Sequence, residues 1–172
     1  MNDFDRTLAV VLGVEGELSD RGPEADPGGL TNYGVTQGAY DAWRARKGLP
    51  EASVRNISGS EVRRIYEEGY WNPTGGPLLP WPINLLVFDY AVNSGVSRAV
   101  RALQLALRVP NDGIVGPKTA AAAAERVRDK EWLGLFLADR VLYMSILSNW
   151  PQNKRGWLKR LNWLAFEIGK AL

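Results

Sequence analysis

Apolar residues recur at helical spacing over most of this 172-residue chain, and clusters of Gly and Pro interrupt them. In the first segment, Phe4, Leu8 and Val11 fall on one helical face, and Gly16 marks the end of the pattern. Similar segments follow as far as the C-terminus, the last two over about 130–148 and 153–170, with Trp150-Pro151 expected to separate them. The pattern predicts a mainly α protein with about seven helices.

A short β region is expected near residues 29–36. It follows a stretch rich in turn residues, and Thr31, Tyr33 and Val35 are strand formers. Helix start signals come directly after it: Thr36 is a candidate N-cap, and Ser58 with Glu61 forms a capping box whose helix is expected to end by residues 71–73. With 45% hydrophobic residues, the chain is long enough to form one compact domain without a disulfide or metal.

The chain contains no Cys and no His. This excludes thiol nucleophiles, disulfides and thiolate metal sites, and it excludes Ser-His-Asp triads and histidine-ligated zinc hydrolases. Catalysis must therefore rest on carboxylates, hydroxyls, amides, Lys or Arg. Carboxylate chemistry at neutral pH points first to glycoside hydrolysis, without a metal or organic cofactor.

The net charge of +2 is too small to indicate a nucleic-acid binder. Positive charge is concentrated in residues 150–172, which hold five basic residues and one acid. Such a segment suits an anionic polymer or surface, although it is equally typical of a solvated helix face. No apolar run is long enough to span a membrane, so we expect no stable membrane insertion. No signal peptide is visible, so we expect synthesis in the cytoplasm.

Glu15 is the best candidate for a catalytic residue. It lies at the expected C-terminal end of the first helix, after Leu12, Gly13 and Val14. The negative end of the helix dipole and partial burial both disfavour a charged carboxylate, so both raise its pKa. A general acid near neutral pH requires such a shift. An exposed helix-end Glu without a catalytic role is the alternative, and Glu17 is the rival carboxylate.

Asp26 and Thr31 are the next candidates. Asp26 begins Asp-Pro-Gly-Gly, which is also a good turn sequence in its own right. Thr31 on a short strand facing Glu15 would hydrogen-bond a water molecule, and it is equally an ordinary strand former. Aromatic rings and amides that suit a polysaccharide cleft are Tyr33, Gln37, Tyr70, Trp71, Asn72, Asp89 and Asn93.

Two of these cleft candidates share one face of an apolar helix. Asp89 and Asn93 are four residues apart, and polar groups on a buried helix need either partners or a cleft. For Tyr70 and Trp71, a place in the core is at least as good an interpretation.

The segment from Glu15-Gly16 to Asp26-Pro-Gly-Gly-Leu-Thr-Asn-Tyr-Gly-Val-Thr36 resembles the N-terminal signature of glycoside hydrolase family 108. These are lysozyme-like N-acetylmuramidases of phage endolysins and bacteria. In the second half, Phe88 to Gly95 and Asp-Gly-Ile-Val-Gly-Pro-Lys-Thr119 look like the peptidoglycan-binding region that accompanies the family.

The resemblance implies an α+β lysozyme-like fold, with a catalytic region over residues 1–95 and a helical binding region over 96–172, packed as one domain. It implies an endolysin-type muramidase that cleaves the β-1,4 bond between N-acetylmuramic acid and N-acetylglucosamine in bacterial peptidoglycan. Glu15 matches the catalytic Glu, and Asp26 and Thr31 match the other two members of a Glu-Asp-Thr arrangement. By family analogy we expect a monomer that reaches the wall after holin-type release.

Three other functions remain open. A lytic transglycosylase would use the same Glu and form a 1,6-anhydro product. A non-catalytic wall-binding or secretion-accessory module would keep the fold without the activity. A nucleic-acid binder with a helix-turn-helix around residues 97–128 would show salt-sensitive DNA binding.

Overall fold

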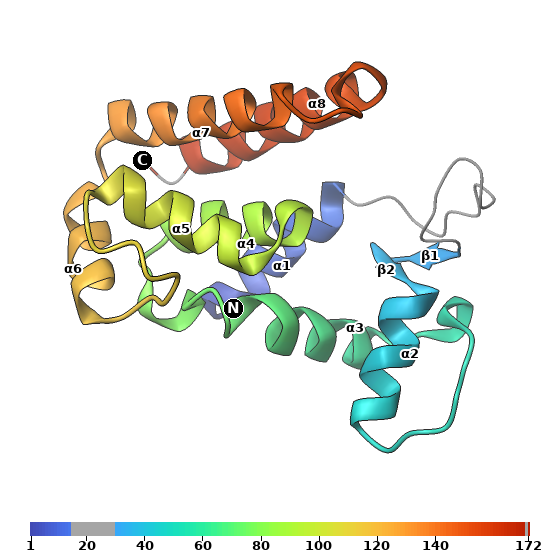
Figure 1. Cartoon of the computed structure of the whole chain (residues 1–172). Coiled ribbons are helices and arrows are strands. Elements are labelled where there is room, and N and C mark those ends of the chain that lie inside the picture. The colour runs from blue at the N-terminus through green and yellow to red at the C-terminus, as the bar shows by residue number, and fades with distance from the viewer. Residues whose placement is uncertain (15–29, 171) are drawn as a thin grey trace.

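The computed structural model describes residues 1–14, 30–170 and 172. Over these residues the chain forms eight α-helices and one two-stranded antiparallel sheet (Figure 1). The elements, with shorter helical turns labelled η, are α1 (Asp3–Val14), β1 (Thr31–Asn32), β2 (Val35–Thr36), α2 (Gln37–Arg46), η1 (Val54–Asn56), α3 (Gly59–Tyr66), η2 (Glu67–Trp71), η3 (Gly76–Leu78), α4 (Ile83–Ser94), α5 (Val96–Leu107), α6 (Pro117–Arg126), α7 (Lys130–Ser145) and α8 (Trp150–Gly169). This confirms the mainly α, lysozyme-like α+β class and the β-hairpin, with eight α-helices where about seven were expected.

Helix α4 is the centre of the molecule. Every residue from Ile83 to Ala91 is buried, which is typical of a helix surrounded by others. Helices α1 and α5 and the turns η2 and η3 all contact it. In Figure 1, α7 and α8 lie side by side along one edge, and α2, α3 and the β-hairpin form the opposite end of the molecule.

A cluster of aromatic rings joins the N-terminal helix to α4. The ring of Phe88 on α4 lies 6.2 Å from that of Phe4 and 5.9 Å from that of Trp71. Tyr66 and Tyr70 extend the cluster toward the β-hairpin, with centroids 6.1 and 6.4 Å from Phe88. Large apolar rings supply much of the buried area that holds such a core together.

Gly76 is required by the packing of this cluster. A Cβ atom there would lie 2.4 Å from the ring of Trp71, which Phe4 and Phe88 hold in place. We expect Gly76→Ala to destabilise the protein by about 1–3 kcal/mol because the ring has nowhere to move. Thermal unfolding checks this against Gly134→Ala on α7, where the new methyl group meets open space. The control should be neutral or slightly stabilising, since Ala favours helix over Gly; equal losses would contradict the account.

The expected helix starts are confirmed where side chains cap them. Thr36 accepts a hydrogen bond from the Ala39 amide, and Ser58 and Glu61 form the capping box of α3. The helix expected to run from Ser58 to about residue 71 changes character on the way, because α3 passes into the π-helical turn η2. The two expected C-terminal helices are present, but the break between them lies at residues 146–149 and not at Trp150-Pro151. Pro151 lies in the first turn of α8, where a residue without an N–H group is tolerated.

No helix in the described ranges is both long enough and apolar enough to cross a membrane.

Candidate functional site

The predicted acid, Glu15, directly follows helix α1 in the sequence. Helix α1 ends at Val14, and its inner face packs into the core through Phe4, Leu8 and Val11. Glu15 and Asp26 lie outside the described residues, so their geometry is not part of the structure. The third member of the predicted arrangement, Thr31, lies half-buried on β1 and pairs across the sheet with Thr36.

The β-hairpin that carries Thr31 turns tightly. Asn32 pairs with Val35, so two residues, Tyr33 and Gly34, make the turn. Both have positive φ angles, 50° and 73°, as the type I′ turn of a two-residue hairpin requires. Gly tolerates this conformation easily, whereas Tyr33 adopts it because the surrounding structure holds the turn.

Hydrogen bonds from Asn32 on β1 and Gln37 on α2 join the hairpin to the 52–56 segment. The buried amide of Asn32 donates to the carbonyls of Val54 and Arg55, at 3.1 and 3.2 Å. Gln37 accepts from the Val54 amide at 2.8 Å and donates to the Ala52 carbonyl at 2.9 Å. Gln37 is therefore a support of the 52–56 segment, a role that its place in the sequence alone did not indicate.

Tyr66 holds the turn from the other side, since its hydroxyl donates to the Tyr33 carbonyl at 2.9 Å. Sequence analysis did not select Tyr66. The sequence signal that could have identified Tyr66 was its place on the inner face of the capped helix α3. This face directs the Tyr66 hydroxyl toward the hairpin.

Replacing Asn32 tests how strongly the hairpin depends on this support. In Asn32→Ala, the Val54 and Arg55 carbonyls lose a buried donor, and we expect a loss of about 1–3 kcal/mol of unfolding free energy. Urea titration measures it. Asn162→Ala removes an exposed amide from α8 and should stay within about 0.5 kcal/mol of wild type. A loss no larger than that of the control would show that the hairpin does not need Asn32.

The other predicted cleft residues divide into exposed and packed groups. The Tyr33 side chain is 44% exposed beside Thr31, while Trp71 is 5% exposed inside the aromatic cluster. Tyr70 is half-buried, with its ring 5.7 Å from that of Tyr66, which links it to the hairpin. Asn72 is exposed and lines a separate shallow pocket beside Gly113, Ile114 and Val115.

Asp89 lies at the centre of a buried ion-pair network. Its carboxylate lies 2.6 Å from Arg140 Nη1 on α7 and 2.7 Å from Arg160 Nη2 on α8. Asp89 and Arg140 are each 2% exposed and Arg160 is 8% exposed. Burial raises the pKa of the Asp89 carboxyl, but the two guanidinium groups outweigh it and hold the pKa below its ordinary value. The network fixes both C-terminal helices to α4.

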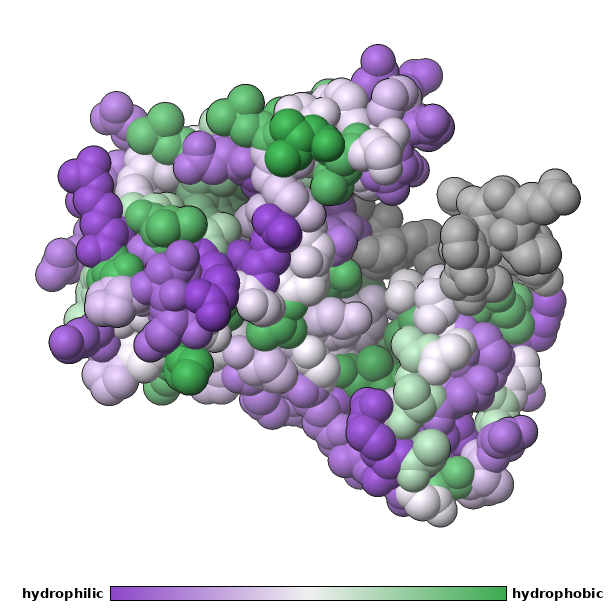
Figure 2. All heavy atoms as spheres, in the orientation of Figure 1, coloured by the Kyte–Doolittle hydropathy of each residue, from purple (hydrophilic) through white to green (hydrophobic). Residues whose placement is uncertain are grey.

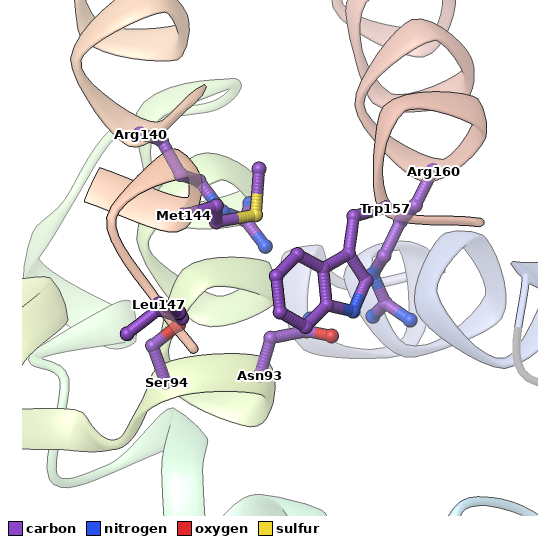
Figure 3. A pocket seen from close by; sticks show the side chains of 7 residues that line it. All are labelled: Asn93, Ser94, Arg140, Met144, Leu147, Trp157 and Arg160. Atoms are coloured by element: carbon purple, nitrogen blue, oxygen red, sulfur yellow. The ribbon is translucent and has the colours of Figure 1, made fainter. Parts of the chain in front are cut away.

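Asn93 lies one turn after Asp89 and donates to its carbonyl at 2.7 Å. It also lines a small pocket of about 50 Å³ between α4, α7 and α8. Figure 3 shows the indole of Trp157 beside Asn93, with Arg160 and Arg140 reaching in from their helices. The structure thus brings Asn93 together with three side chains that were not among the predicted site residues. The requirement that a buried Asp89 have partners was a sequence signal for the two arginines.

Six of the predicted residues form two groups, while Trp71 lies in the aromatic core and Asn72 lines a separate pocket. Thr31, Tyr33 and Gln37 lie on or next to the β-hairpin, and Tyr70 is joined to them through Tyr66. Asp89 and Asn93 lie on α4 beside the C-terminal helices. Within the part of the chain that is described, no group of three or more acidic side chains is placed to hold a metal ion.

Comparison with known proteins identifies the family. The model of the family described as Glycosyl hydrolase 108 matches residues 8–95. The chain belongs to this family. Glycosyl hydrolase 108 membership makes it a glycoside hydrolase, in agreement with the carboxylate chemistry that the absence of Cys and His leaves available.

One solved structure extends the similarity beyond the family match. The structure of SagA from Brucella abortus is 30% identical in sequence and superposes with a TM-score of 0.81. The alignment covers 96% of this chain and 92% of that chain, so the C-terminal helices of this glycosyl hydrolase 108 member share the arrangement seen in SagA. No curated protein matches the chain.

Proposed function

We propose that the chain is an N-acetylmuramidase that hydrolyses the β-1,4 bond between N-acetylmuramic acid and N-acetylglucosamine in bacterial peptidoglycan. The glycosyl hydrolase 108 match over residues 8–95 carries this proposal, because that range contains Glu15, Asp26 and Thr31. The Asp-Pro-Gly-Gly-Leu-Thr-Asn-Tyr-Gly-Val-Thr string within it resembles the family's signature.

In the proposed reaction, Glu15 is the general acid that donates a proton to the glycosidic oxygen. The position of α1 supports this role. The helix ends at Val14 with its inner face in the core, so the carbonyl end of its dipole lies next to residue 15. Negative potential from those carbonyls favours the protonated form of a neighbouring carboxyl group, which is the form that a general acid needs.

Asp26 and Thr31 act on the sugar that water attacks. Asp26 positions the attacking water or stabilises the oxocarbenium-like transition state, and the Thr31 hydroxyl assists it. The placement of Thr31 supports this assignment, since Asn32 and Tyr66 hold the hairpin that carries it and Gln37 holds the segment that Asn32 contacts. A separation of roughly 6.5–9.5 Å between the Glu15 and Asp26 carboxyls would give inversion, and roughly 5–5.5 Å would give retention.

For substrate contacts, exposure favours some candidates over others. We assign direct contacts with the glycan to Tyr33, Asn72 and Asn93, whose side chains reach the surface or a pocket. Trp71 and Asp89 serve by packing and by ion pairing, since both are buried. We further propose that residues 96–172 hold the anionic wall and work as one domain with residues 1–95, in an endolysin-type enzyme.

Digestion of purified peptidoglycan, followed by mass analysis of the products, tests the proposed reaction. Hydrolysis adds one water to each cleaved bond, whereas a lytic transglycosylase would give 1,6-anhydro products that lack it. Anhydro products would therefore replace the hydrolase proposal with the transglycosylase alternative. Binding of the wall without any release of fragments, on several wall types, would instead favour a non-catalytic module.

A further inference from the structure

Among the large apolar side chains that the described residues leave exposed, five lie on α7 and α8, and a sixth, Ile146, directly follows α7. We call them the α7–α8 outer face: Leu135 at 59% exposure, Leu142 at 65%, Ile146 at 79%, Leu158 at 38%, Trp163 at 40% and Phe166 at 58%. Figure 2 shows apolar side chains gathered over α7, at the upper edge of the molecule. Single exposed apolar residues are ordinary, but a set of this size on two adjacent helices indicates a surface that binds something.

On α7 the exposed apolar residues form one stripe. Leu135, Leu142 and Ile146, together with Ala138, recur at helical spacing, so they share one side of the helix. The core side of α7 is separate and carries Leu133, Phe136, Arg140 and Met144. Helix α7 is therefore apolar on both sides, although only one of them packs in this chain.

On α8 the exposed side combines basic and aromatic residues. Arg155, Lys159, Trp163, Phe166 and Lys170 recur at intervals of three or four, which places them along one side of the helix. The ammonium group of Lys170 lies 4.4 Å from the Phe166 ring centroid and 5.7 Å from that of Trp163. Leu161, Leu164 and Ile168 form the opposite, buried side.

The charges on the two helices favour an anionic partner. On and directly after α8, Lys154, Arg155, Lys159 and Lys170 are exposed, against one half-buried acid, Glu167, which lies 2.6 Å from Lys170. On α7 the exposed charges are Lys130, Glu131 and Asp139. Glu131 and Asp139 lie four residues before and after Leu135, so they share the side of the apolar stripe, and the positive charge of the face comes from α8.

We propose that the α7–α8 outer face binds reversibly to the surface of a lipid bilayer that contains anionic lipids. Trp and Phe among Lys and Arg are the residues that lie at the boundary between headgroups and acyl chains, and aliphatic side chains add buried area below them. Each basic residue near an anionic membrane surface strengthens binding by about fivefold.

Two other occupants fit the face less well. A glycan strand binds to flat rings and to hydrogen-bonding groups, which the aliphatic stripe of Leu135, Leu142 and Ile146 does not offer. A second copy of the chain would bring the basic side of one α8 near that of the other. A bilayer with anionic lipids can contact both the apolar and the basic side chains of the face. Binding of the protein to such a bilayer does not depend on the proposed catalytic residues.

Vesicle flotation tests the inference with the purified full chain. We expect the protein to float with vesicles of phosphatidylglycerol and phosphatidylcholine, and to bind vesicles of phosphatidylcholine alone at least about tenfold more weakly. The triple variant Lys154→Gln, Arg155→Gln, Lys159→Gln should lose about a hundredfold in affinity for the anionic vesicles. Leu142→Ser with Ile146→Ser should lose on the order of tenfold through the apolar contribution.

The matched control is Leu49→Ser with Leu105→Ser, which removes two exposed leucines from outside α7 and α8 and should bind vesicles like wild type. Thermal unfolding of each variant checks that the fold is kept. The inference is overturned if wild type binds neither kind of vesicle, or if the control loses as much affinity as the Leu142 and Ile146 variant. It is also overturned if purified peptidoglycan binds the same face while vesicles do not, or if sedimentation shows that the face joins two copies of the chain.

Discussion

Peptidoglycan cleavage should fall by roughly 10²- to 10⁴-fold when Glu15 is replaced with glutamine, because the amide cannot donate the proton that the leaving oxygen needs. Glutamine keeps the size and hydrogen-bonding shape of glutamate. Because the two side chains have the same size, the melting temperature should stay close to that of wild type. The release of reducing ends from purified peptidoglycan measures the rate.

Glu17→Gln is the matched control for this variant, since it removes a neighbouring carboxyl group of the same length. Glu17→Gln should retain activity close to that of wild type. If Glu17→Gln lost the activity while Glu15→Gln kept it, the acid would be Glu17 and the assignment from the family signature would fail. If both variants kept full activity, neither carboxyl group would be the acid.

Replacing Asp89 with asparagine should cause the largest loss of stability. The change leaves the guanidinium groups of Arg140 and Arg160 buried without their counter-charge. Removing one partner of a buried ion pair costs about 3–5 kcal/mol, and for a chain of this length this corresponds to a fall in melting temperature of about 10 °C. Calorimetry checks the result. Asp139→Asn, an exposed carboxyl group on α7, serves as control and should change little.

The Asp89 contribution should also depend on pH. Because the folded-state pKa is held below the ordinary value of 3.8, the ion pair stabilises the folded state above that pH. As the pH falls from 3.8 through the folded-state pKa, this contribution is lost. The stability difference between wild type and Asp89→Asn should therefore narrow in acid. A constant difference from pH 3 to pH 7 would mean that Asp89 acts by packing alone.

Local signals in the sequence were enough for most of the secondary structure. The capping box at Ser58 marks the start of α3, because the Ser58 and Glu61 side chains bond backbone N–H groups only a few residues away. Trp150-Pro151 was interpreted as a separator because proline breaks helix interiors. The same residue is compatible with a first turn, and only the tertiary position of α8 decides between the two.

Contacts between distant segments could not be read from the sequence in the same way. The polar pair Asp89 and Asn93 on an apolar helix indicated that a partner or a cleft must exist. Nothing local indicated that Arg140 and Arg160, 51 and 71 residues away, supply the partner. The same holds for Gln37 and Tyr66, whose hydrogen bonds to distant backbone groups support the β-hairpin. The Asp-Pro-Gly-Gly string, by contrast, indicated the family, which the match over residues 8–95 confirms.

The most direct test of the proposed activity identifies the sugar at the newly formed chain end. Peptidoglycan digested by the wild-type protein is reduced with borohydride and then hydrolysed in acid, which converts each new reducing sugar into its alcohol. The account predicts that the alcohol of muramic acid accumulates with time and is absent after incubation with Glu15→Gln. Accumulation of the alcohol of glucosamine would contradict the account because it would place the cut on the other glycosidic bond.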